Sequence, residues 1–266
     1  MQTLDQFKQD LIQLLGDNLF EIIIHGSYVL DDFQPGKGDL DYVVVTNENL
    51  DDSANFRLFE LHDRYRSGKK LLLHQLEGTF YPKHFLKKLS FPFTGCYIGT
   101  GIKGWRTINS FQNSLMDLRL INEHGVHLLG KNPKIYNPLN FEILKEQLSD
   151  LETFIISAKA GKNVGIGMWI TIVHWCSRTI FYYSTGRIGS KTEACRWCTK
   201  RPELEPFRDV FKNAECRRYP HGEEAVSSST RTVCMVLLEF MENYLLSIDL
   251  QSDSDKQCYS GAVDKG

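Results

Sequence analysis

Two aspartates separated by one residue, Asp39 and Asp41, lead into the apolar run 42–46. Side chains alternate between the two faces of a strand, so both carboxylates are expected on the same side. Neighbouring anions repel each other unless a cation lies between them, and Mg²⁺ prefers carboxylate and phosphate oxygens. The pair therefore predicts a magnesium site, with an ordinary Asp-rich turn as the alternative for an isolated Asp-x-Asp.

Gly26 and Ser27 precede the aspartates and follow a second apolar run, 19–25. A Gly-Ser turn that enters a helix brings backbone N–H groups close to phosphate oxygens, and the serine hydroxyl adds a donor. The sequence contains no GxxxxGK[ST] loop, so a triphosphate would depend on this turn, on metal and on cations elsewhere. The turn and the paired aspartates together predict a site for a metal-bound phosphate group.

A third carboxylate, Glu77, ends the run 70–77, which the sequence predicts to be the next strand. There it could complete the metal site or act as the general base that takes the proton of an attacking hydroxyl. We expect it to be the base, because a hydroxyl near its free pKa is a poor nucleophile. The alternative is a solvated glutamate at the end of a strand.

The order of strand, Gly26-Ser27 and Asp39-x-Asp41 resembles the nucleotidyltransferase superfamily that includes DNA polymerase beta. In the second half of the sequence, residues 177–197 look like the C-terminal helical domain of the aminoglycoside adenylyltransferases that modify streptomycin and spectinomycin. Segment 123–130 also resembles the part of that family that joins its two domains. Together these resemblances span most of the chain.

The resemblance implies an enzyme that transfers AMP from ATP to a hydroxyl of a small aminoglycoside or aminocyclitol, with release of pyrophosphate and with antibiotic resistance as its role. By position it assigns Asp39, Asp41 and Glu77 as Mg²⁺ ligands, and Glu77 also as the catalytic base. It assigns Arg178 and Lys191 as ATP-binding cations. The local alternatives are an ion-paired helix arginine and a surface lysine, although a lysine at a helix start opposes the helix dipole.

The sequence departs from the family where the acceptor would bind. The family has acidic residues shortly before the ATP-binding arginine, whereas segment 164–170 contains no carboxylate. A cationic acceptor would need acidic side chains elsewhere in its binding site, and Glu77 and Asp117 are the candidates. Trp105 and Trp169 could stack on a sugar or a cation, but a large aromatic side chain in a helix is more often part of the core.

Two other functions stay open as alternatives. One is the same chemistry on a macromolecule, either an RNA end or a protein side chain, and the other is a non-catalytic nucleotide-binding homologue. The formal net charge of -2 and the pI near 6.5 give no basic face of the kind expected for nucleic-acid binding. RNA is therefore the less expected acceptor.

The protein is expected to be cytoplasmic. Its amphipathic N-terminus contains acidic residues and lacks the pattern of a secretory signal. The most apolar stretch, 164–183, contains a histidine and an arginine, so it predicts a buried helix rather than a membrane span. The 7 scattered cysteines fit reduced thiols, and Cys195 and Cys198 are expected to be two cysteines of one helix.

The hydrophobic pattern predicts an α+β protein with two domains. Residues 1–138 are expected to form a nucleotidyltransferase domain with a mixed β-sheet flanked by helices, residues 139–250 an all-α helix bundle, and residues 251–266 a disordered tail. The predicted helices are 3–15, 54–65, 141–160, 163–185, 191–200 and 223–247. Gly186 is predicted to close one helix of the bundle, and Ser190 with Glu193 to form the capping box of the next.

Overall fold

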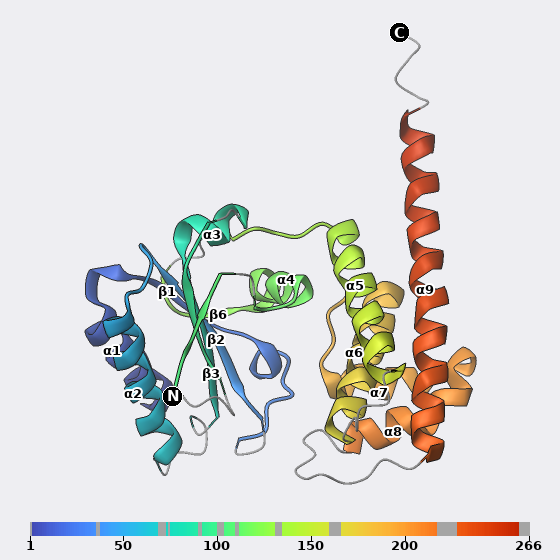
Figure 1. Ribbon diagram of the computed structural model, residues 1–266, viewed down its shortest axis with the longest axis horizontal. Helices are drawn as coiled ribbons and strands as arrows, with labels where there is room; N and C mark the ends of the chain where they lie inside the picture. Colours follow the sequence, from blue (N-terminus) through green and yellow to red (C-terminus); the bar gives the residue numbers. More distant parts are fainter. Residues whose placement is uncertain are drawn as a thin grey trace. The chain divides into compact units, whose positions relative to one another are not determined.

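The computed structural model describes residues 2–35, 38–68, 73, 75–89, 92–99, 104–109, 112–130, 135–159, 166–216 and 228–260. The chain divides into two compact units, Met1–Pro138 and Leu139–Gly266 (Figure 1). The first unit contains the sheet, and the second is built from helices, which confirms the α+β class.

A six-stranded sheet in the order β5-β4-β3-β2-β1-β6 forms the centre of the first unit. Strands β2 and β3 are parallel, whereas every other neighbouring pair is antiparallel, so the sheet is mixed as predicted. The parallel pair needs a crossover, which helix α2 (Asp52–Ser67) supplies. The strands are β1 (Leu19–Ile24), β2 (Leu40–Thr46), β3 (Leu76–Pro82), β4 (Gly95–Ile98), β5 (Arg106–Ile108) and β6 (Val126–Leu129).

Each face of this sheet packs against its own helices. Helix α1 (Gln2–Leu15) and α2 cover one face, and the alternate side chains Tyr42 and Val44 of β2 point into that core. Val43 and Val45 point to the other face, where α3 (Lys83–Lys88) and α4 (Leu115–His124) complete a second core. Strand β2 is buried on both faces, which explains why its sequence is a continuous apolar run rather than an alternating one.

The second unit is a helix bundle around α6 (Ile166–Thr185). Side chains from several sides of α6 are buried, including Trp169 and Cys176, as expected for a central helix. The surrounding elements are α5 (Asn140–Lys159), α7 (Lys191–Cys198), the short 3₁₀ segment Pro202–Phe207, α8 (Arg208–Cys216) and α9 (Ser228–Ser260). Within the described residues, no helix is both long enough and apolar enough to cross a membrane.

Two predicted elements differ in position from the structure. Strand β3 begins at Leu76 instead of ending at Glu77, and residues 69–72 and 74 of the predicted strand lie outside the described residues. The sequence of β3 contains a glycine and a proline, residue types that are common in turns and that obscure the strand. Its Thr, Phe and Tyr favour a strand, and the proline is tolerated because it occupies the last position. Helix α9 continues through Ser260, into the tail for which disorder is predicted, and residues 261–266 lie outside the described part.

Candidate active site

The parallel pairing of β2 with β3 places Asp41 directly opposite Glu77. Both residues project to the same face of the sheet as Val43 and Val45, since they are separated from these valines by an even number of register positions. Asp39 lies one residue before β2 and is two residues from Asp41. All three carboxylate residues are half-buried. The structure therefore brings the predicted base beside the predicted metal-binding pair.

Gly26 contacts the Asp41 carboxylate from the end of β1. It adopts a left-handed backbone conformation with φ +65°, and a Cβ atom at this position would overlap Asp41 Oδ2. The N–H of the preceding residue, His25, donates to the Asp41 carbonyl oxygen at 3.0 Å. Only glycine fits both the conformation and the close approach. The Gly-Ser turn and the aspartates are thus immediate neighbours.

The turn after β1 is shorter than the sequence suggests. Gly26–Tyr28 forms a single 3₁₀ turn, in which the Ser27 carbonyl oxygen accepts from the N–H of Asp32 at 3.0 Å. The prediction that Gly26 and Ser27 enter a helix is therefore wrong, and a helix dipole is not available to a phosphate here. Any phosphate contact at this turn depends on its own N–H groups and on the Ser27 hydroxyl.

Glu77 is held by a residue that the sequence did not single out. The Tyr97 hydroxyl on β4 donates to Glu77 Oε1 at 2.8 Å. Burial raises the pKa of Tyr97, and the negative charges of Glu77 and Asp39 raise it further, whereas Arg106 opposes the rise.

A buried histidine lies beside the Gly-Ser turn. His25 is 4% exposed, and burial lowers its pKa to about 4, while the charge of Asp117 on α4 opposes this shift. Asp117 itself accepts from the N–H of Ser114 in the capping box that begins α4. His25 is therefore neutral at pH 7. Asp117, which the sequence suggests as an acidic side chain of the acceptor site, stabilises the start of α4.

The two tryptophans that could stack on an acceptor belong to cores. Trp169 is 1% exposed inside the helix bundle. Trp105 packs against the core beneath α1 and α2, with its ring 6.1 Å from that of Phe56 and 6.5 Å from that of Phe59. This core lies on the opposite face of the sheet from Asp41 and Glu77. Trp169 is thus buried within the second unit, and Trp105 packs on the face of the sheet opposite to Glu77.

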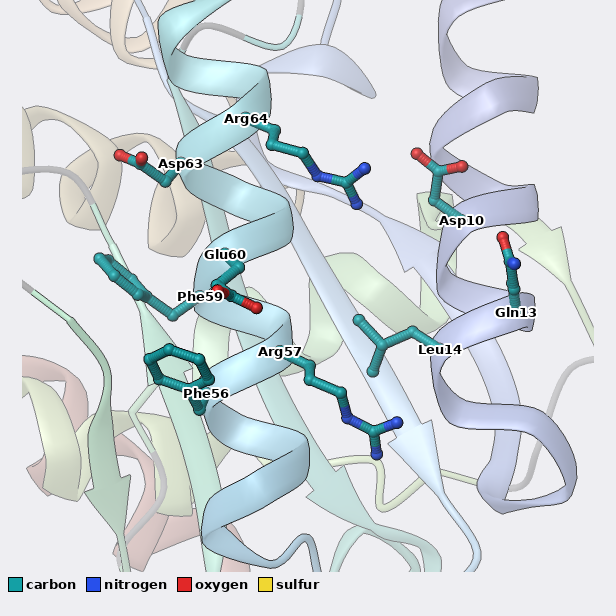
Figure 2. Close-up of a pocket in the computed structure, with 9 residues that line it drawn as sticks. All are labelled: Asp10, Gln13, Leu14, Phe56, Arg57, Phe59, Glu60, Asp63 and Arg64. Atoms are coloured by element: carbon teal, nitrogen blue, oxygen red, sulfur yellow. The ribbon is translucent and has the colours of Figure 1, made fainter.

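A groove of 760 Å³ lies between α1 and α2, on the side of the first unit away from the carboxylates. In Figure 2, Arg57 and Arg64 of α2 extend toward α1, where Asp10 and Gln13 lie. The groove contains none of the predicted site residues. It therefore adds nothing to the site on the other face of the sheet.

In the second unit, a hydrogen bond connects Arg178 to the loop that leads to Lys191. Arg178 Nε donates to the Gly189 carbonyl oxygen at 3.2 Å, and Arg178 itself is half-buried on α6. Lys191 is the first residue of α7 and is exposed. The Ser190 hydroxyl caps this helix by accepting from the N–H of Glu193 at 3.1 Å. The two cations that the resemblance assigns to ATP thus belong to one connected region.

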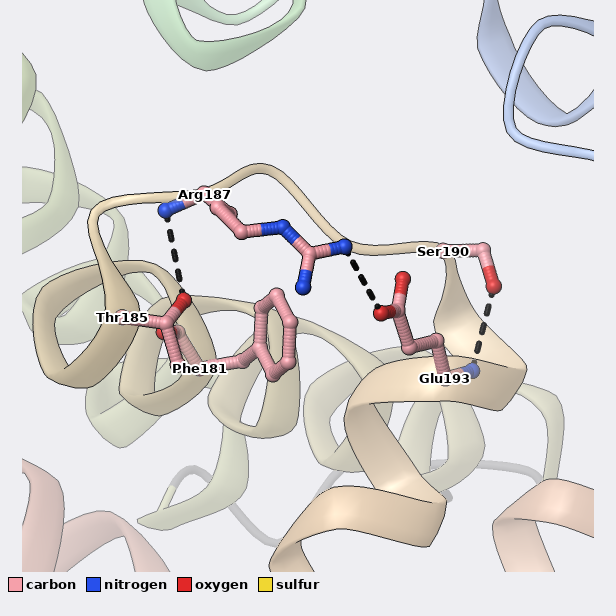
Figure 3. A network of polar contacts seen from close by, with 5 residues as sticks. All are labelled: Phe181, Thr185, Arg187, Ser190 and Glu193. Atoms are coloured by element: carbon pink, nitrogen blue, oxygen red, sulfur yellow. Dashed lines mark hydrogen bonds and ion pairs between the residues drawn. The ribbon is translucent and has the colours of Figure 1, made fainter.

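The turn between α6 and α7 has the predicted glycine and one half of the predicted capping box. Gly186 has φ +70°, and its N–H donates to the Tyr182 carbonyl oxygen at 2.7 Å, which closes α6 as expected. The Glu193 carboxylate pairs with Arg187 at 3.1 Å, and the Arg187 guanidinium also lies over the Phe181 ring (Figure 3). This exposed ion pair connects the loop before Lys191 to the first turn of α7.

Residues 4–94 match a family model described as a nucleotidyltransferase domain. This part of the chain is similar to nucleotidyltransferase domains. It includes the Gly-Ser turn, both aspartates and Glu77. The match confirms the superfamily that the sequence resembles and the expectation of an enzyme of this kind.

Almost the whole chain shares its fold with the crystal structure of spectinomycin adenyltransferase AAD(9) from Enterococcus faecialis with ATP and spectinomycin. The TM-score is 0.61 at 17% sequence identity, and the alignment covers 92% of this chain and 98% of that chain. A search of curated protein sequences found no match. The structural likeness confirms the resemblance to the aminoglycoside adenylyltransferases in fold.

The donor set of the nucleotidyltransferase domain fits Mg²⁺ only if substrate oxygens complete the coordination. Among the residues that the structure describes, no three His, Cys, Asp or Glu side chains are grouped so as to hold a metal ion. Mg²⁺ in phosphoryl-transfer sites is commonly bound by one or two carboxylates together with substrate phosphates and water. Asp39 and Asp41 are two such carboxylates, and Gly26 packs so closely against the Asp41 carboxylate that a larger residue would not fit there. Glu77 accepts a hydrogen bond from Tyr97, so one of its two oxygens is already engaged within the sheet.

Proposed function

We propose that the protein transfers AMP from ATP to a hydroxyl group of a small aminocyclitol or aminoglycoside-like acceptor, with release of pyrophosphate. The observation that carries this proposal is the pairing of Asp41 with Glu77 across parallel strands, with Gly26 packed on the Asp41 carboxylate. Asp41 can then help to hold a metal-bound phosphate, while Glu77 on the neighbouring strand accepts a proton. The shared fold with a spectinomycin adenyltransferase supports this acceptor class.

In this mechanism, Glu77 takes the proton of the acceptor hydroxyl as its oxygen attacks the α-phosphorus of ATP. The new oxygen–phosphorus bond forms in line with the bond to the β-phosphate, which breaks, so that pyrophosphate leaves. The N–H groups of the turn at Gly26 and the Ser27 hydroxyl orient phosphate oxygens. Asp39 and Asp41 would hold Mg²⁺, which when bound neutralises charge on the reacting phosphates.

Arg178 and Lys191 are proposed to bind the phosphates of ATP, as the corresponding cations of the resembled family do. Their support here is the hydrogen bond from Arg178 to Gly189, two residues before Lys191, together with the capped start of α7. Cations at these positions would offset the charge of the leaving pyrophosphate.

A cytoplasmic location is part of this proposal. The cysteines whose side chains are described are all free, and 5 of them, Cys96, Cys176, Cys195, Cys198 and Cys234, are buried. Free, scattered thiols are typical of a reducing compartment, where ATP is also abundant.

The proposal is tested by incubating the purified protein with MgATP and either spectinomycin or streptomycin. We expect pyrophosphate release that depends on one of these acceptors and an acceptor product whose mass has increased by one AMP group. A parallel reaction with radiolabelled ATP, bulk tRNA and cell protein identifies a macromolecular acceptor. Label on the polymer alone, or no acceptor-dependent pyrophosphate at all, would contradict the proposal.

A further inference from the structure

The hydroxyl of Tyr97 contacts Glu77 from the neighbouring strand on the same face of the sheet. Tyr97 on β4 is opposite Thr79 on β3, two residues beyond Glu77, so the pair is diagonal across an antiparallel ladder. A long aromatic side chain reaches such a diagonal neighbour. The donated bond to Glu77 Oε1 measures 2.8 Å, a good length for a hydrogen bond from a hydroxyl to a carboxylate.

The ring of Tyr97 is held in place by the next strand. Arg106 on β5 pairs with Tyr97 across the ladder, and its guanidinium lies 5.0 Å from the centre of the ring. Arg106 Nη2 in turn donates to Gln112 Oε1 at 2.7 Å. The Tyr97 hydroxyl is therefore held by a series of contacts across β5, β4 and β3. These contacts limit the orientations of the Glu77 carboxylate.

A carboxylate that must accept a proton from a bound hydroxyl needs a fixed orientation, because small displacements in a reacting pair cost large factors in rate. The side chain of glutamate has three rotatable bonds and is poorly ordered unless other groups hold it. The Tyr97 hydroxyl supplies such a restraint at Oε1. Hydrogen bonds to an ionised carboxylate are also stronger than neutral ones, so the restraint is effective in a half-buried site.

We propose that Tyr97 is a positioning residue for nucleotidyl transfer, which orients the Glu77 carboxylate toward the acceptor hydroxyl. This assignment rests on the proposed role of Glu77 as the base. It predicts that the Tyr97 hydroxyl contributes to turnover and not to the binding of ATP or acceptor.

The test compares Tyr97→Phe with wild type and with Tyr65→Phe as a matched control. The Tyr65 hydroxyl donates to Asp10 Oδ2 at 2.7 Å, so the control removes the same kind of bond between α1 and α2, away from Glu77. In Tyr97→Phe we expect kcat for AMP transfer from MgATP to spectinomycin to fall by about tenfold to a hundredfold, with both KM values within about twofold of wild type. Tyr65→Phe should keep the wild-type kcat.

Two results would overturn the assignment of Tyr97. One is a wild-type kcat in Tyr97→Phe. The other is a parallel loss of kcat, substrate affinity and thermal stability, which would indicate a structural role only. Crystal structures of both proteins provide a readout that needs no acceptor: Glu77 should have one orientation in wild type and a changed or multiple orientation in Tyr97→Phe.

The crystal structures also separate this assignment from the proposed function. If wild type transfers AMP to none of the acceptors tested, the proposed function fails. The Tyr97 assignment is then decided by the Glu77 orientation alone, and an identical carboxylate position in the two structures would reject it.

Discussion

At the scale of single residues, the Asp41 carboxylate is positioned by neighbours from two other segments. Gly26 packs directly on it in a left-handed conformation, and the parallel register places Glu77 beside it. These contacts put the turn that is proposed to bind phosphate, the carboxylate that is proposed to bind metal and the proposed base within one small region. The region depends on the absence of a side chain at position 26.

Gly26→Ala should therefore remove activity by displacing Asp41. The new methyl group would overlap Asp41 Oδ2, and the left-handed conformation costs an alanine about 1–2 kcal/mol. Gly16→Ala is the matched control, because Gly16 has φ +52° but no atom within 4 Å of an added Cβ. Kinetics and thermal melts should show that both variants lose some stability and that only Gly26→Ala loses transfer. Equal activity in the two variants would contradict the role of the close approach.

At the scale of elements, α2 is joined to β2 by a buried polar contact behind the site. The Tyr42 hydroxyl forms a hydrogen bond with His62 Nε2, and both side chains are fully buried. Burial, together with a smaller effect of the nearby charge of Arg66, lowers the pKa of His62 from 6.5 to about 3. His62 is therefore neutral in the folded protein at any pH above this value.

This histidine makes folding sensitive to acid. Below about pH 6.5 the unfolded chain binds a proton at His62 that the folded chain does not bind, so stability rises with pH up to this value and is constant above it. The folded state should lose roughly 2 kcal/mol from this group between pH 6.5 and pH 5. Urea unfolding at several pH values measures the slope, and His62→Gln should reduce it. The same slope in both proteins would show that His62 does not titrate in this way.

The sequence predicts the elements whose signals are local. The apolar runs of β1 and β2 and the long helices α1, α2, α5 and α6 follow from periodicity over many residues. The close approach of Glu77 to Asp41 depends on the pairing of β2 with β3. The resemblance to the superfamily predicts this proximity, although the strand predicted at 70–77 is found at Leu76–Pro82. Tyr97 could not be found this way, because β4 is only 4 residues long and its contact with Glu77 arises from the ladder between β3 and β4.

At the scale of the whole molecule, each unit has a core of its own, and the residues proposed for one reaction belong to both units. If Arg178 and Lys191 bind ATP, Arg178→Ala and Lys191→Ala should each raise the KM for ATP about tenfold, the cost of one lost charge-assisted hydrogen bond. Lys200→Ala, an exposed lysine just after α7, is the control. Steady-state kinetics measure these values. An unchanged KM for ATP in both Arg178→Ala and Lys191→Ala would show that these residues of the second unit do not bind ATP.

The most direct measurement of the central claim is pyrophosphate release by Asp41→Asn in the presence of MgATP and spectinomycin. The substitution keeps the shape of the side chain and removes its charge, and Asp63→Asn on the exposed side of α2 is the control. We predict that Asp41→Asn loses turnover by about a hundredfold or more and keeps the wild-type melting temperature within a few degrees. Wild-type turnover in a folded Asp41→Asn protein would contradict the account.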